Sequence, residues 1–156
     1  MEAARRTTTL LLAAAALALL TTGCSSDAAA PAAAAGGSST PGALSVQGPR
    51  SHLELSGARL AGGELKLTVR NEGKVPEHLS VVSTEQDGRA TLTGSQGPDN
   101  ALTSAGVLIK PGESAVFGGQ GPTIKFPKPG AAHPTDVDTI LIFSVSGLVH
   151  LTTPTG

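Results

Sequence analysis

The stretch Glu64–Ser83, ELKLTVRNEGKVPEHLSVVS, alternates between apolar and polar residues, and this alternation decides the fold class. In its first part Leu65, Leu67 and Val69 recur at every second position, with charged or hydroxyl-bearing residues between them. Successive side chains of a β-strand point to opposite faces, so the pattern predicts a strand with one buried face and one face in water.

The second part of the stretch predicts a return strand. Residues Asn71–Lys74 favour a tight turn, because Asn tolerates and Gly readily adopts positive φ angles. Beyond Pro76 the alternation resumes and places Leu79, Val81 and Ser83 on one face. We therefore expect the two strands to pair as a β-hairpin.

Comparable segments fill the chain up to Pro154, separated by turns rich in Gly and Pro, of which the chain has 20 and 11. Residues Asp136–Ser146 have apolar residues on both faces, which is typical of a central strand. We expect Val137, Thr139, Leu141, Phe143 and Val145 on one face and Ile140 and Ile142 on the other. With no helical periodicity after the N-terminal region, the sequence predicts an all-β antiparallel sandwich of seven or eight short strands.

Residues 1–23 have the features of a secretion signal. Arg5 and Arg6 precede the apolar run Leu10–Leu20, whose 11 residues are too few to span a bilayer as a helix. The segment ends at Gly23-Cys24, and Cys24 is the only cysteine of the chain. This arrangement resembles the bacterial lipobox, in which the cysteine is lipidated and becomes the new N-terminus. The alternative is an ordinary signal peptide followed by an incidental cysteine.

Lipidation of Cys24 implies a protein anchored to the cell membrane on its extracytoplasmic face, since two acyl chains such as palmitate suffice for stable anchoring. Residues 24–49 are mainly Ala, Gly, Ser, Thr and Pro, and this composition predicts a flexible tether. The folded domain is then expected at residues 50–156. With Cys24 lipidated, the domain has no cysteine left for a disulfide.

Several function classes are disfavoured by composition. A net charge of −1 without a basic cluster argues against nucleic acid as a partner. The chain has no Gly-x-Ser-x-Gly elbow, no P-loop and no His and acid at triad-like positions, so we do not expect an enzyme and name no catalytic residue.

Four segments together resemble the periplasmic copper chaperone family PCuAC. They are ELKLTVRNEGKVPEHLSVVST (64–84), GVLIKPGESAVF (106–117), TIKF (123–126) and VDTILIFSVSGLVHLTT (137–153). The similarity covers roughly Leu53 to Pro154. It implies a cupredoxin-like β-sandwich that binds copper outside the cytoplasmic membrane and passes it to cytochrome oxidase assembly.

The copper ligands of that family are a His, a Met and a His-x-Met motif, and the resemblance assigns their positions to Thr93, Ala101, Thr123 and Lys125. Cu(I) selects soft thioether and thiolate donors, whereas these residues offer hydroxyl, methyl and ammonium groups. The only Met of the chain is Met1. We therefore expect the Cu(I) site to be lost and no cofactor to be bound.

Copper or another metal remains an alternative through ligands that the family does not use. His133 with Asp136 and Asp138 is the nearest approach to a hard-donor cluster in the sequence. The other histidines, His52, His78 and His150, occupy strand positions that we expect to be exposed surface.

The resemblance also implies that residues 93–101 and 120–125 meet at one end of the sandwich. Loops on a rigid scaffold often carry binding residues, and these are small and polar. The candidate partner surface consists of Ser95, Gln96, Asn100, Gln120 and Lys125. We expect a binding or scaffolding module with an unidentified envelope protein as partner; the alternative is a duplicated copy whose site has decayed into solvated loops.

Overall fold

The computed structural model describes residues 39–127 and 134–156, which form strands and turns and include no helix. No described segment is therefore a helix long and apolar enough to cross a membrane. Cys24 and His133 lie outside the described residues, and so does most of the expected tether.

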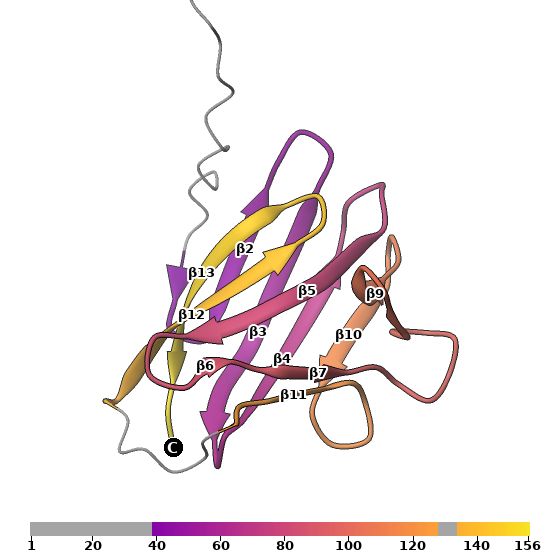
Figure 1. Ribbon diagram of the computed structural model, residues 1–156. Coiled ribbons are helices and arrows are strands. Elements are labelled where there is room, and N and C mark those ends of the chain that lie inside the picture. Colours follow the sequence, from indigo (N-terminus) through magenta and orange to yellow (C-terminus); the bar gives the residue numbers. More distant parts are fainter. Residues whose placement is uncertain (1–38, 128–133) are drawn as a thin grey trace, which may run out of the picture. The chain divides into compact units, whose positions relative to one another are not determined.

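Two antiparallel sheets face one another as a sandwich (Figure 1). The first sheet contains β1 (Ser39–Thr40), β2 (Ala43–Gln47), β3 (His52–Ala61), β4 (Glu64–Asn71), β11 (Thr123–Lys125) and β7 (Thr91–Thr93) in that order, and β10 (Ser114–Phe117) also pairs with β4. The second contains β13 (Gly147–Pro154), β12 (Asp136–Phe143), β5 (Glu77–Thr84), β9 (Gly106–Ile109) and β8 (Leu102–Thr103), and β6 (Gly88–Arg89) also pairs with β5.

The predicted all-β sandwich is confirmed, but the strand count is not. The described residues form thirteen strands rather than seven or eight, because several pairings involve only two or three residues. Such short segments contain too few residues for an alternating pattern to be recognised.

Apolar side chains from both sheets fill the space between them. Leu65, Leu67 and Val69 are buried as the alternation predicts, and so are Phe117 of the first sheet and Phe143 of the second. Each large apolar side chain buried in this way contributes about 1.5–3 kcal/mol to folding. No cysteine lies among the described residues, so this core and the strand hydrogen bonds stabilise the domain.

The predicted hairpin between β4 and β5 is wrong, because the two strands belong to different sheets. β4 pairs with β3, β10 and β11, whereas β5 pairs with β12, β9 and β6. Asn71 explains the difference. Its buried amide donates to the carbonyls of Val75 (2.8 Å) and Ile109 (3.0 Å), and its Oδ1 accepts from the N–H of Gly73 (2.9 Å). These bonds shape a wide crossover instead of a tight reversal.

A second crossover, from β9 to β10, is fastened to the same residue. The N–H of Gly112 donates to the carbonyl of Asn71 (2.7 Å), and the N–H of Asn71 donates to the carbonyl of Glu113 (2.9 Å). Gly112 has a φ of 78°, as the third residue of a Pro-Gly turn requires. Asn71 thereby joins both connections at this end of the sandwich.

The domain begins earlier than predicted. β2 pairs with β3 through Leu44 opposite Leu55 and Val46 opposite Leu53, and Val46 is only 4% exposed. The expected tether and the domain boundary at residue 50 are therefore wrong for residues 39–47. The segment ALSVQ does alternate, but its small neighbours concealed a strand of five residues.

Two predicted side-chain orientations also change. In β5, Val82 rather than Val81 is buried, because one extra residue lies opposite the Ile142–Phe143 step of β12 and shifts the alternation. Val145 is 44% exposed, because β12 ends at Phe143 and the chain then turns.

The turn after β12 is held by a buried carboxylate. Glu77 of β5 is fully buried, and it accepts hydrogen bonds from the N–H groups of Val145 and Ser146 (both 2.9 Å). The hydroxyl groups of Ser144 and Ser146 also donate to it. A carboxylate with this many donors is well satisfied although it is removed from water.

Hydrogen bonds also connect the two sheets along both sides of the sandwich. On one side the N–H of Gly42 donates to the carbonyl of Thr152 (2.8 Å), and Leu60 forms a parallel bridge with Thr155. On the other side the chain passes from β6 in one sheet to β7 in the other, and Ala90 donates to Val82 (2.9 Å). Strands that change sheets in this way form the corners of such a sandwich.

We predict that Asn71→Ala lowers the free energy of unfolding by about 2–4 kcal/mol, because buried main-chain groups of both crossovers lose their partners. Asn71→Asp should be no better, since a carboxylate cannot donate to the carbonyls of Val75 and Ile109. Urea denaturation measures the effect. The control Lys74→Ala, exposed in the same crossover, should change stability by less than about 0.5 kcal/mol.

Candidate functional site

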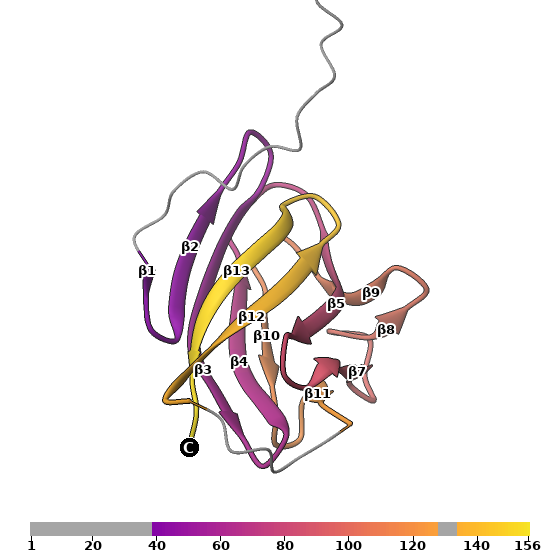
Figure 2. The same ribbon diagram turned by 60° about the vertical axis from the view of Figure 1, so that its left-hand side comes forward.

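The structure brings together the positions that the resemblance assigns to copper ligands. Thr93 of β7 lies directly opposite Thr123 of β11, and Lys125 lies two pairs further along, opposite Thr91. Ile124 between them is fully buried, so the other three side chains share the outer face of this ladder. Figure 2 shows β7 and β11 side by side, at the opposite edge of the sheet from β1 and β2.

Ala101 joins this group through Gly94. A Cβ added to Gly94, the residue after Thr93, would stand 2.1 Å from the backbone nitrogen of Leu102. The backbone after β7 therefore lies against the segment that begins with Ala101. Hydroxyl, methyl and ammonium groups are the functional groups at these four positions, and none of them fits the preference of Cu(I) for soft ligands.

Two residues of the expected partner surface maintain the loop after β7. The hydroxyl of Ser95 donates to the carbonyl of Asp99, and the amide of Asn100 donates to the carbonyl of Leu108 (3.1 Å). Asn100 also has a φ of 53°, which Asn tolerates better than most residues. Gln96, Gln120 and Lys125 are exposed instead.

Lys110 fastens the same loop. Its ammonium lies 2.7 Å from a carboxylate oxygen of Asp99 and 3.5 Å from one of Glu113. The hydrogen bond to Asp99 is the main reason that the pKa of Lys110 is raised.

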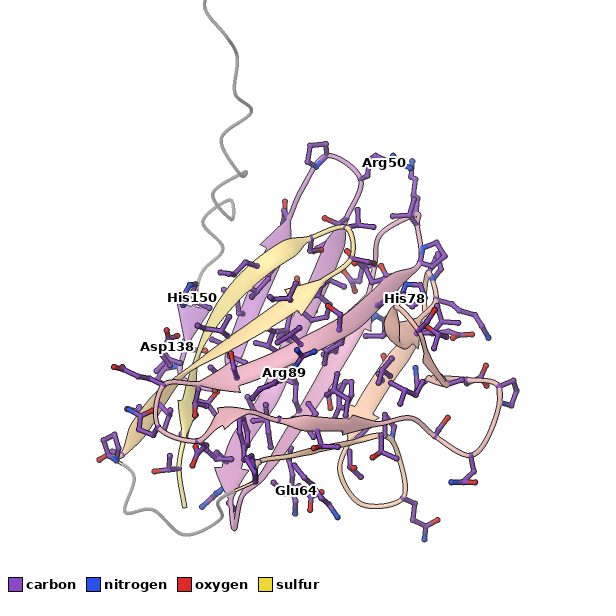
Figure 3. The ribbon with its side chains drawn as sticks, in the orientation of Figure 1. Arg50, Glu64, His78, Arg89, Asp138 and His150 are labelled. Carbon is purple, nitrogen blue, oxygen red and sulfur yellow. The ribbon has the colours of Figure 1, made fainter. Side chains whose placement is uncertain are left out.

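The hard-donor cluster proposed from sequence is only partly described. Asp136 and Asp138 are exposed on β12, and His133 lies outside the described residues. Asp138 is paired with a different histidine, since its Oδ2 lies 2.8 Å from Nδ1 of His150 on β13. Figure 3 shows this pair on the outside of the sheet.

A second cluster was missed by sequence reasoning. His52 Nε2 lies 3.0 Å from Glu54 Oε1, and His52 Nδ1 lies 3.5 Å from Glu72 Oε2. The prediction of exposed surface is wrong for His52 and His78, which are half-buried, and right for the exposed His150. The His-x-Glu spacing was visible in the sequence, but the approach of Glu72 depends on the crossover after β4, which the expected hairpin did not provide.

Neighbouring side chains orient the two carboxylates of this cluster. The hydroxyl of Ser45 on β2 donates to Glu54 Oε1 (2.6 Å), and Arg70 Nε lies 3.1 Å from Glu72 Oε1. The hydrogen bond from Ser45, followed by the contacts with His52, lowers the pKa of Glu54 below its ordinary value. A cavity of about 370 Å³ lies beside the cluster, between the loop Gly48–His52 and the crossover Glu72–Val75.

We predict that Ser45→Ala raises the pKa of Glu54 toward its ordinary value of 4.5. The variant lacks the hydroxyl whose hydrogen bond stabilises the ionised carboxylate. A carboxyl group whose pKa is lowered by folding stabilises the protein above its unfolded pKa, and this contribution disappears as the pH falls through the folded pKa. The stability difference between wild type and Ser45→Ala should therefore shrink from pH 7 to pH 3.

Carboxyl-carbon NMR titration measures the pKa of Glu54. Urea denaturation in the presence of a chelator measures the free energy of unfolding at each pH. Ser56→Ala, in an exposed position of β3, is the matched control. An unchanged Glu54 midpoint in Ser45→Ala would contradict the assigned cause.

Comparison with known proteins supports the fold. No protein-family model matches the chain, and no curated protein matches it by sequence. Among solved structures, the copper-bound PCuAC domain from PmoF2 aligns with a TM-score of 0.54 at 13% identity, over 66% of this chain and 91% of that domain. The apo PCuAC domain from PmoF1 aligns with a TM-score of 0.53 at 19% identity, over 67% and 92%. The chain therefore contains a cupredoxin-like β-sandwich with the fold of PCuAC domains.

Proposed function

We propose that the protein is a lipid-anchored binding or scaffolding module on the extracytoplasmic face of the cell membrane. Its PCuAC-like domain no longer holds Cu(I) and is not an enzyme. The exposed part of the β7–β11 ladder and its two loops forms the surface for an envelope protein. Copper binding by the similar PCuAC domain of PmoF2 belongs to that protein.

The observation that carries this proposal is the pairing of Thr93 with Thr123, with Lys125 beside them. The fold keeps the positions together, while the side chains lack the thioether and imidazole groups that would hold Cu(I). The outer face of the ladder instead presents hydroxyl groups and one ammonium. An ammonium recognises a carboxylate or phosphate, so an acidic segment is the partner chemistry that fits best.

Membrane attachment is supported by the apolar run before Gly23-Cys24. The domain has its first strand at residue 39, so fourteen residues, 25–38, separate it from Cys24. Even a fully extended chain of this length spans at most about 50 Å. The module would therefore act close to the membrane surface.

We predict that the purified protein fails to take Cu(I) from a chromogenic chelator, and that a variant with the four ligands restored succeeds. This variant carries Thr93→His, Ala101→Met, Thr123→His and Lys125→Met. It should bind about one Cu(I), because Thr93, Thr123 and Lys125 share one ladder and the segment at Ala101 lies against Gly94 beside it. Thr93→His alone is the control and should compete poorly. Stoichiometric Cu(I) binding by the wild type would contradict the proposed loss of the site.

We also predict that a photoreactive residue at Gln120, in intact cells, captures one reproducible protein of the membrane fraction. Lys125→Glu should abolish the capture, because it reverses the charge beside the ladder. The matched probe at Lys74 is exposed in the β4–β5 crossover and should not capture it.

Mass spectrometry of the same fraction should find the protein beginning at acylated Cys24. Capture from Lys74 alone, or an unmodified Cys24 in the medium, would refute the corresponding part of the proposal.

A further inference from the structure

Three potential metal ligands lie together at the opposite end of β4 from the β7–β11 ladder. His52 and Glu54 belong to β3 and Glu72 follows β4, and one ligand atom from each lies within 4.8 Å of the others. Glu64, the first residue of β4, pairs with Lys125 of the ladder. At about 3.3 Å per residue, Glu64 and Glu72 are roughly 25 Å apart. Figure 3 labels Glu64 at one end of the sandwich and Arg50, two residues before His52, at the other.

The backbone fixes the positions of the three residues before any ion binds. His52 and Glu54 point outward because the alternate residues Leu53 and Leu55 are buried. The N–H of Glu72 donates to the carbonyl of His52 (2.8 Å), so the crossover is attached directly to the start of β3. Ligands on such a connected backbone lose little conformational entropy when they bind an ion.

The donor chemistry is that of a borderline divalent cation. One imidazole with two carboxylates suits Zn²⁺ or Cu²⁺ and is a poor set for Cu(I), which prefers sulfur. The ion would take one ring nitrogen of His52, and the carboxylate that now faces the other ring nitrogen would turn toward the ion to complete the set. The side chains are 34–41% exposed, which gives an ion access to them.

Two further residues adjust the site. Ser45 donates to Glu54, and Arg70 contacts the Glu72 oxygen other than the one that faces His52. Both carboxylates are thus oriented by residues outside the cluster, as the ligands of metal sites commonly are. The charge of Arg70 opposes that of a bound cation and should weaken the site.

The adjoining cavity supplies room for the remaining coordination positions. His52 and Glu72 both line this space of about 370 Å³. Three protein ligands leave Zn²⁺ at least one position for water or for a small exchangeable ligand. The rest of the lining comes from the loop before His52 and the crossover after Glu72, and it includes the cationic residues Arg50 and Lys74, whose charges oppose a bound cation as that of Arg70 does.

We propose that His52, Glu54 and Glu72 bind one divalent cation of the Zn²⁺ and Cu²⁺ class. This inference goes beyond the proposed function, since it concerns a different surface and a different class of ligand. It also differs from the cluster around His133 that the sequence indicated. The bound ion would link β3 to the β4–β5 crossover and, through Ser45, to β2.

The test is isothermal titration of the purified protein with Zn²⁺, repeated with Cu²⁺. We expect one ion per chain, with affinity at least about tenfold lower in His52→Ala and in Glu72→Gln. Arg70→Gln should raise the affinity about 3- to 10-fold. His150→Ala removes an exposed histidine that also has a carboxylate partner, and it is the matched control. Its affinity should equal that of the wild type.

A second measurement keeps the result independent of folding. The ring resonances of His52 should shift on addition of Zn²⁺, while those of His150 should not, in a protein whose far-UV circular dichroism is unchanged. No saturable binding below millimolar Zn²⁺ would overturn the proposal. An affinity of His52→Ala equal to that of the wild type would also overturn it. If His133→Ala loses binding while His52→Ala does not, the ion binds near His133 instead.

Discussion

The side chain of Asn71 determines how the two sheets are connected. This side chain is fully buried. Its amide nitrogen donates to the carbonyls of Val75 and Ile109, and its amide oxygen accepts from the N–H of Gly73. A buried carbonyl or N–H without a partner costs about 1–3 kcal/mol, which is a large part of the net stability of a domain. Correct placement of β4 and β10 in one sheet, and of β5 and β9 in the other, therefore depends on this amide. The position of Glu72 depends on it as well.

Elements with long, regular alternation could be predicted from the sequence, and irregular ones could not. Leu65, Leu67 and Val69 are buried as expected, because every second side chain of a strand points to the same face and the other face lies in water. The alternation does not show which strands pair with each other. The turn residues after β4 fit a hairpin equally well, and the crossover is held by contacts with distant residues, such as the one between Asn71 and Ile109, which is 38 residues away. The bulge in β5 likewise depends on its partner β12.

The two candidate surfaces differ in how far the sequence revealed them. Thr93 and Thr123 were expected near one another from the family resemblance, and the strand register agrees. The loop beside them was read as free polar surface, yet Asn100 is committed to the carbonyl of Leu108. The cluster around His52 was missed, because its third member approaches only through the crossover. Sequence patterns report the periodicity of an element and not the neighbours that tertiary folding supplies.

The closed sides of the sandwich affect how copies of this protein behave toward each other. An open sheet edge exposes a row of unpaired N–H and C=O groups that can template pairing with another molecule. Here Gly42 bonds to Thr152 on one side, and the segment joining β6 to β7 bonds to Val82 of β5 through Ala90 on the other. Edge-to-edge aggregation is thereby disfavoured without a disulfide among the described residues, although the outward positions of β13 include Leu148 beside His150 and Thr152. Copies of the domain that are crowded together at high local concentration therefore offer one another fewer open edge groups for pairing.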